Sequence, residues 1–227
     1  MRTRFDKELD DLNLELIHMG SLVEQSIQMA VKALTVRDKV LARNTVEFDA
    51  QINEMDNRIE QHCLKLLLHQ QPVADDLILI STALKMITDL ERIGDHASDI
   101  SEIVLNMNIG EHPKKLDHIS MMAKETTKMV NMSIDAYVKR DKSTAEEVIK
   151  RDDIVDNLFC LVRSEIIDLI HNDRNCGERA IDLIMIAKYF ERIGDHAENV
   201  AEWAMFSITG EHRQGGRMTN FFSKPPQ

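Results

Sequence analysis

The sequence predicts an all-α fold of two tandem, pseudo-symmetric, antiparallel three-helix bundles, with six long helices in total. Apolar residues recur in steps of three or four through most of the 227 residues, which is the pattern of amphipathic helices. The stretch 91–97, ERIGDHA, recurs letter for letter at 191–197, and such a repeat indicates a duplicated unit. The chain has 13 Met but only 4% aromatic residues, a composition that favours helix packing over a sheet.

The first half contains three predicted helices. Residues 5–34 form the first, which turns at Arg37-Asp38. Residues 41–66 form the second, which ends before Pro72 because the residue before a proline is pushed out of the helical region. Asp75-Asp76 begin the third, where acids suit the helix dipole, and Gly110 and Pro113 end it. The inner face of this third helix is predicted to carry Leu77, Ile80, Leu84, Ile87, Leu90 and Ala97.

The second half repeats the pattern. Helices are predicted over 119–136, 148–169 and 184–201, with a loop at 171–177 and the last helix ending near Gly210. The expected domains are therefore 1–112 and 113–212. Residues 213–227 hold Gly-Gly, Pro-Pro and three basic residues without an acid, so we expect a flexible C-terminal tail. A tail that binds a partner is the alternative.

Composition and charge restrict the classes of function. The formal net charge is -11, which disfavours nucleic-acid binding and fits a cation or a partner with a basic patch. The three cysteines form no CxxC pair, and the N-terminus has no apolar signal core. The longest uncharged apolar run, 77–84, is far shorter than the ~20 residues of a membrane span. These features predict a cytoplasmic protein without membrane insertion.

The acids of the repeated motif face the apolar side of their helix. At ~100° per residue, Asp95 lies ~40° from Glu91, among the apolar stripe, whereas His96 points elsewhere, at ~140°. Glu191 and Asp195 behave alike. Burying like charges costs several kcal/mol per unpaired ion, roughly. Protonation, an Arg or Lys partner, or a metal ion must therefore compensate them.

The preceding helix of each unit adds a second pair of oxygen ligands. Asp49 and Asn53 are spaced i,i+4 in the first unit, and Asp152 and Asp156 in the second. Two such pairs on adjacent helices predict an all-oxygen site for Mg, Mn, Ca or ferric iron. A structural zinc site is not expected, because no cysteine is near and the motif histidine faces away. The alternative is that the acids are solvated surface pairs.

Two mid-helix glycines, Gly94 and Gly194, stand at the same place in the two copies of the motif. Such a glycine costs ~1 kcal/mol relative to Ala, so its recurrence suggests the close approach of a helix or a ligand. The other histidines are interpreted as ordinary surface or core residues: His18, His62, His69, His118 and His171.

Two ERIGD motifs, each preceded by a helix with D-x-x-x-[DN], resemble the PhoU family, the accessory proteins of high-affinity phosphate transport. The Met-Gly-Ser-Leu-Val-Glu stretch at 19–24 and the Gly-Glu pairs at 110 and 210 are also similar to it, and the resemblance spans 5–212. It implies two symmetric bundles, a homodimer, and metal ions or small metal clusters on E(D)xxxD motifs. The ligands it implies here are Asp49, Asn53, Glu91, Asp95 and Asp99 in the first unit, and Asp152, Asp156, Glu191, Asp195 and Asn199 in the second.

The two units depart from the full acidic pattern at opposite places. Asn53 stands against Asp156, and Asn199 stands against Asp99. Each unit therefore keeps four acids and one amide. We expect similar but unequal metal affinities.

The resemblance also implies a role. PhoU-type proteins are non-enzymatic negative regulators of the phosphate-starvation response. They link the ATPase subunit of the phosphate ABC transporter to a sensor histidine kinase, and such partners would recruit this protein to the inner face of the membrane. The sequence itself contains no nucleophile–base arrangement and no P-loop pattern, so we expect no catalytic and no organic cofactor-binding residues.

A ferritin-like di-iron protein, binding iron or acting as an oxidase, is the main alternative function. Its site needs a Glu-x-x-His pair on each of two helices plus two further Glu. Here Glu15-x-x-His18 stands alone, and neither copy of the motif carries ExxH. The sequence therefore argues against this alternative. A helical structural protein with surface acids is the third possibility.

Overall fold

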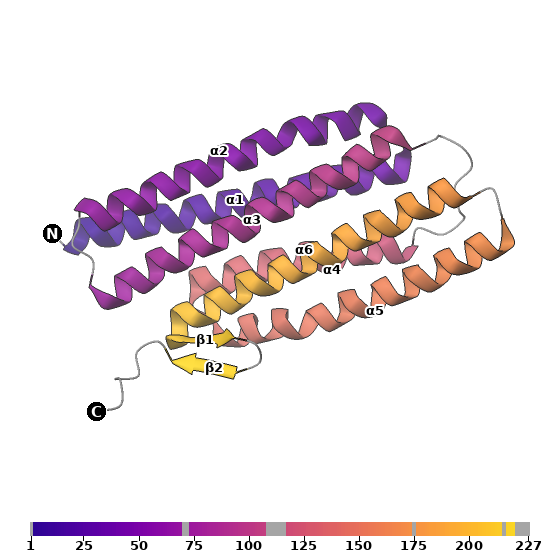
Figure 1. Ribbon diagram of the computed structural model, residues 1–227. Helices are drawn as coiled ribbons and strands as arrows, with labels where there is room; N and C mark the ends of the chain where they lie inside the picture. The colour runs from indigo at the N-terminus through magenta and orange to yellow at the C-terminus, as the bar shows by residue number, and fades with distance from the viewer. Residues whose placement is uncertain (1, 70–72, 108–116, 174–175, 215–216, 221–227) are drawn as a thin grey trace.

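The computed structural model describes residues 2–69, 73–107, 117–173, 176–214 and 217–220. Within these residues it confirms the all-α class: six long helices dominate, and one small hairpin follows them (Figure 1). In chain order the helices are α1 (Arg2–Val36), α2 (Lys39–His69), α3 (Ala74–Asn106), α4 (Asp117–Lys139), α5 (Lys142–Asn172) and α6 (Gly177–Thr209).

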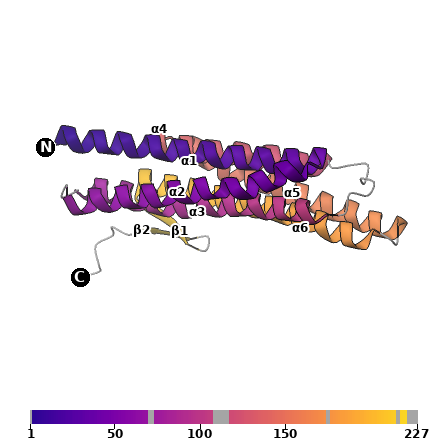
Figure 2. The same cartoon turned by 90° about the horizontal axis from the view of Figure 1, so that it is seen from above.

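Two three-helix units lie side by side. Helices α1, α2 and α3 contact one another, and so do α4, α5 and α6. The units meet where α3 packs on α6 and where α1 packs on α4. Figure 2 shows α1 and α4 on one side of the molecule, with the other four helices beneath them. The second and third helices of each unit, which carry the predicted ligands, are therefore neighbours.

The apolar stripes form one core that continues through both units. Along α1, for example, Leu12, Leu16 and Met19 are almost completely buried. One residue of the predicted inner face departs from this pattern. Leu77 is 44% exposed, because it lies in the first turn of α3, at the end of the bundle. None of the described helices is both long and apolar enough to cross a lipid bilayer.

The short turn between the first two helices has the same Arg-Asp structure in each unit. Arg37 and Arg140 adopt left-handed φ values of 58° and 52°. The aspartate that follows each arginine then caps the next helix. The Asp38 carboxylate accepts two backbone N–H groups at 2.9 and 3.0 Å, and Asp141 accepts two at 2.9 and 3.3 Å. The predicted turn at Arg37-Asp38 is therefore confirmed.

The C-terminal region contains secondary structure that differs from the predicted flexible tail. Helix α6 ends at Gly210, which has a φ of 70°. Strands β1 (Glu211–Gln214) and β2 (Arg217–Asn220) then pair antiparallel, and β1 contacts α6. The segment predicted as a flexible tail from residue 213 thus includes part of a hairpin. A Gly-Gly pair between two short segments is a hairpin signal, and the sequence carries one at 215–216.

Several predictions lie outside the described residues. They are the helix-ending Gln70–Pro72 segment, the helix stop at Gly110 and Pro113, and the domain boundary between residues 112 and 113. The described part of α3 ends at Asn106, where the N–H of Met107 caps it by bonding to the Ile103 carbonyl.

Candidate metal centres

The two motif glycines let an aspartate-bearing helix approach closely. A Cβ atom added to Gly94 of α3 would lie 2.8 Å from Ile52 Cδ1 and 3.3 Å from Asp49 Oδ1 of α2. A Cβ atom added to Gly194 of α6 would lie 3.0 Å from Asp152 Oδ1 of α5. The sequence prediction of close approach at these positions is confirmed, and the neighbour in both units is the helix that carries the aspartate.

The first carboxylate cluster forms where α2 meets α3. Asp49 is half-buried, and its Oδ2 accepts a hydrogen bond of 2.8 Å from the Asn53 amide. Its Oδ1 atom is buried without a hydrogen-bond partner. Burial raises the pKa of Asp49, and Asp95 and Asp99 raise it further, whereas the bond from Asn53 lowers it. A buried acceptor with no donor and a raised pKa marks negative charge that is not fully compensated.

An arginine compensates part of this charge. Arg92 Nη1 donates to Asp95 Oδ2 at 3.0 Å, and its Nε lies 3.7 Å from Glu91 Oε2. The pKa of Glu91 nevertheless stays raised, first by burial and then by Asp95. The sequence left three ways to compensate the buried negative charge: protonation, a basic partner or a metal ion. A basic partner and a shift toward protonation are both present in this cluster.

The second cluster forms at the equivalent place between α5 and α6. Asp152 Oδ1 is again buried without a partner. Burial raises the pKa of Asp152 to about 7, with Glu198 and Asp195 adding to the shift. Burial and Glu191 also raise the pKa of Asp195, while Lys188 lowers it. Lys188 is ion-paired with Glu191, so this cluster too has one basic neighbour.

Two predicted ligands of the second unit lie at or beyond the edge of this cluster. Asp156 is exposed but close enough to raise the pKa values of Asp152 and Asp195. The Asn199 amide instead donates to Asp89 of α3 at 3.2 Å. Asn199 therefore faces the other unit.

Glu198 is the acid that sequence reasoning missed. It is first among the charged neighbours that raise the pKa of Asp152. Its position, seven residues after Glu191, puts it ~20° from Glu191 on the helix. The count of ~100° per residue that places Asp195 on the inner face of the helix also places Glu198 there.

The histidines of the motif join the two units. His96 packs against α6, and its ring also reaches Asp99 at the edge of the first cluster. Its ring lies 5.5 Å from that of His196 and 5.4 Å from that of Tyr189, centroid to centroid. His196 Nδ1 hydrogen-bonds Asp89 Oδ1 at 2.8 Å, and His96 Nδ1 lies 3.4 Å from Asp99 Oδ2. Burial is the first cause that lowers the pKa of His96, so this contact between α3 and α6 favours neutral imidazole.

The chemistry of the clusters is that of oxygen ligands. No group of three or more His, Cys, Asp or Glu side chains is arranged to hold an ion in the part of the chain that the structure describes.

The glutamate of the lone Glu15-x-x-His18 pair serves another purpose. Glu15 accepts hydrogen bonds of 2.8 Å from Arg58 and 2.7 Å from His62, so this carboxylate is occupied by an ion-pair network on α1 and α2.

Comparison with known families gives one consistent result. The family model described as the PhoU domain matches residues 16–104 and 119–204. A PhoU homolog of Clostridium acetobutylicum, a phosphate-specific transport system accessory protein, is 37% identical over 92% of this chain and 96% of its own length. The Escherichia coli K12 protein of that name is 27% identical over 92% of this chain and 86% of its own length.

Solved structures agree with the sequence relatives. The crystal structure of PhoU from Pseudomonas aeruginosa has a TM-score of 0.85 at 35% identity, covering 91% of this chain and 99% of that one. The phosphate transport system regulatory protein PhoU from Streptococcus pneumoniae also has a TM-score of 0.85, at 27% identity, covering 92% and 98%.

Proposed function

The chain belongs to the PhoU family, and on this premise we propose that it is a metal-binding negative regulator of the phosphate-starvation response and of high-affinity phosphate uptake. In this proposal it works without catalysis, as a cytoplasmic homodimer that connects the ATPase of a phosphate ABC transporter with a sensor histidine kinase. The names of its relatives, accessory and regulatory proteins of phosphate transport, support the regulatory part.

The repeated carboxylate cluster is the observation that carries the metal-binding part of the proposal. Each unit holds one buried, unpartnered aspartate oxygen, Asp49 Oδ1 or Asp152 Oδ1, facing the motif helix at its glycine. Carboxylate donors of this kind fit hard cations such as Mg, Mn, Ca or ferric iron. A bound cation would supply the positive charge that each cluster lacks and would draw its side chains together.

In this proposal, the cations would be held by the acids whose charges raise one another's pKa values in each cluster. Asp49, Glu91 and Asp95 would be the principal ligands of the first site, with Asn53 and Asp99 at its edge. The principal ligands of the second site would be Asp152, Glu191 and Asp195, with Asp156 and Glu198 beside them.

The overall charge supports a role in binding proteins. A net charge of -11 on a rigid helical scaffold favours partners with basic surfaces and speeds their association. Neutralising the two clusters with metal would change the surface that such partners meet. We therefore propose that the metal-loaded form is the one that binds the transporter ATPase and the kinase.

The first test is metal content per chain, measured by elemental analysis on untagged protein purified without chelator. Glu91→Ala with Asp95→Ala and Glu191→Ala with Asp195→Ala should each lower the content by the share of one site. A matched control is Glu178→Ala with Asp182→Ala, an i,i+4 acid pair of α6 outside both clusters, which should leave it unchanged. Metal-free wild type, or unchanged content in both cluster variants, would contradict the proposal.

The regulatory part is tested in cells that lack the chromosomal copy and carry a reporter of the phosphate-starvation response. Wild-type protein should repress the reporter when phosphate is plentiful, and the two cluster variants should not. Full repression by both variants, at equal protein level, would show that regulation does not need the clusters. No repression by the wild type would overturn the regulatory role itself.

A further inference from the structure

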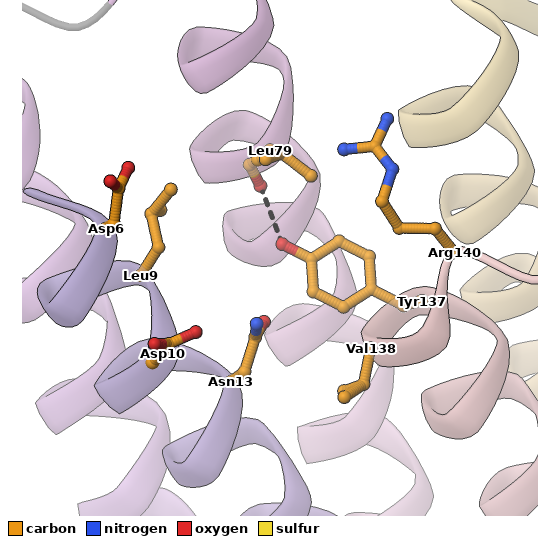
Figure 3. Close-up of a pocket in the computed structure, with 8 residues that line it drawn as sticks. All are labelled: Asp6, Leu9, Asp10, Asn13, Leu79, Tyr137, Val138 and Arg140. Carbon is orange, nitrogen blue, oxygen red and sulfur yellow. Dashed lines mark hydrogen bonds between the residues drawn. The ribbon is translucent and has the colours of Figure 1, made fainter. Parts of the chain in front are cut away.

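A cavity of about 240 Å³ lies between the two units, and no residue of the carboxylate clusters lines it. Its walls come from the first turns of α1, from α3 at Leu79 and from the end of α4 (Figure 3). Because α1 and α3 belong to one unit and α4 to the other, the cavity exists only when the two units are packed together.

The walls of the cavity carry opposite charges. Asp6 and Asp10, one helical turn apart, lie on the α1 side with Asn13 beside Asp10, and Arg140 lies on the opposite, α4 side (Figure 3). All three charged side chains, Asp6, Asp10 and Arg140, are exposed. The surface between the charged walls is apolar: Leu9, Leu79 and Val138.

Hydrogen bonds fix the α4 side of the cavity before any ligand arrives. The Tyr137 side chain is buried, and its hydroxyl donates to the Leu79 carbonyl at 3.0 Å. Arg140 Nη2 donates to the Ser207 carbonyl of α6 at 3.3 Å. These two bonds tie the end of α4 to α3 and to α6. A pocket that is already formed loses little affinity to ordering on binding.

We propose that this cavity binds a small zwitterion, a molecule with an ammonium group and a carboxylate on a short aliphatic body, such as a free amino acid. The three N–H donors of an ammonium group suit the two carboxylates Asp6 and Asp10, and a carboxylate suits the planar fork of Arg140. The aliphatic body would pack on Leu9 and Leu79. The three charges sum to minus one, so the cavity disfavours an anion such as inorganic phosphate. This site is separate from the metal centres and does not rest on the proposed function.

The test is a calorimetric titration of the full-length protein in buffer with chelator, so that metal binding plays no part. The probes are glycine, β-alanine, 4-aminobutanoate and 6-aminohexanoate, with butylamine and butanoate as analogues that carry one charge. One of the four zwitterions should bind saturably, about tenfold or more tighter than butylamine or butanoate. The gain is expected because each charged end of the zwitterion adds its own hydrogen bonds.

Variants assign the two ends of the ligand. Asp10→Asn should weaken the zwitterion about tenfold, whereas Asp11→Asn, at the next position of α1 but outside the cavity, should not change binding. Arg140→Lys should weaken the zwitterion and leave butylamine unchanged. The proposal is overturned if no zwitterion binds saturably, if butylamine binds as tightly as the best zwitterion, or if Asp11→Asn acts like Asp10→Asn. Far-ultraviolet circular dichroism confirms that each variant is folded.

Discussion

Asp152 shows at the scale of one residue how far the fold tolerates unfavourable charge. The pKa of its carboxyl is raised to about 7 by burial and by Glu198 and Asp195, whereas an unfolded aspartate titrates near pH ~4. The folded state therefore keeps this proton to higher pH than the unfolded state does. By linkage, the contribution of Asp152 to stability falls as the pH rises from about 4 to 7, and the loss remains above that window.

Replacing this carboxyl with an amide should remove the effect. In the metal-free protein at pH 8, Asp152→Asn should increase the free energy of unfolding by roughly 1–2 kcal/mol, a discounted figure because the side chain keeps contact with solvent. At pH 4 the variant and the wild type should be alike. Urea denaturation at several pH values measures this, with the exposed neighbour Asp153→Asn as control. Parallel pH profiles of wild type and Asp152→Asn would show that burial does not perturb this group.

Gly194 controls the position of the same carboxylate. An alanine Cβ there would lie 3.0 Å from Asp152 Oδ1, so the carboxylate must shift by a few tenths of an ångström, roughly. Stability should change by less than about 1 kcal/mol, because the helix propensity gained offsets the crowding. The metal affinity of the second site should fall about tenfold, because a ligand is displaced.

The control is Gly177→Ala, at a position where an added Cβ meets no atom of the described residues within 4 Å. That variant should keep its metal affinity. Manganese titration of both variants, together with urea denaturation, separates displacement of a ligand from general destabilisation. Equal affinities in the two alanine variants would show that Gly194 serves packing alone.

At the scale of the elements, most of the fold could be predicted because helix signals are local. The 3.6-residue stripes located all six helices, and Arg37-Asp38 and Gly210 ended helices where the structure ends them. A contact across helices is not local, and such contacts were predicted less well. Asn199 was grouped with the acids of its own unit, yet it bonds Asp89 of the other unit. Only the packing of α3 on α6, which no single helix encodes, decides between these partners.

The packing of α3 on α6 depends on Asp89, which accepts hydrogen bonds from His196 and Asn199 of the other unit. Its side chain is only 14% exposed, and removing it leaves the His196 and Asn199 donors without this acceptor. Asp89→Ala should cost about 1–3 kcal/mol of unfolding free energy. Asp135→Ala, which breaks an exposed ion pair with Lys139, should cost less than about 0.5 kcal/mol.

Urea denaturation measures both variants, and a double-mutant cycle of Asp89→Ala with His196→Ala isolates the contact between the units. The cycle should give a coupling energy clearly above that of the Asp135–Lys139 pair. A cost for Asp89→Ala as small as that for Asp135→Ala would mean that apolar packing alone holds α3 on α6.

At the scale of the whole molecule, the two units are variations on one plan. In the first unit Glu15 of α1 pairs with His62 of α2. In the second, His118 of α4 pairs with Glu165 of α5 at the equivalent positions. Both units therefore contain a Glu–His pair between their first two helices, but the glutamate lies on the first helix in one unit and on the second helix in the other. Equivalent positions of the two carboxylate clusters can likewise hold different residues, so the two clusters need not bind metal equally.

The clusters differ in how much of their negative charge is compensated. In the first, the Asn53 amide donates to Asp49, and Arg92 lies against both Glu91 and Asp95. In the second, the buried Asp152 Oδ1 has no donor, like Asp49 Oδ1, and Lys188 pairs with Glu191 alone, while Glu198 and Asp156 add to the charge around Asp152. A cation gains more free energy where less of the charge is already compensated.

The second site should therefore bind metal more tightly than the first, by about tenfold at pH 8, which corresponds to about 1.4 kcal/mol. The difference should shrink below pH 7, because Asp152 must then release a proton before it can bind a cation. Manganese titration followed by electron paramagnetic resonance resolves the two classes. Glu91→Ala with Asp95→Ala should retain the tighter class, and Glu191→Ala with Asp195→Ala the weaker one. The reverse assignment would mean that pre-organisation by Asn53 and Arg92 outweighs the uncompensated charge around Asp152.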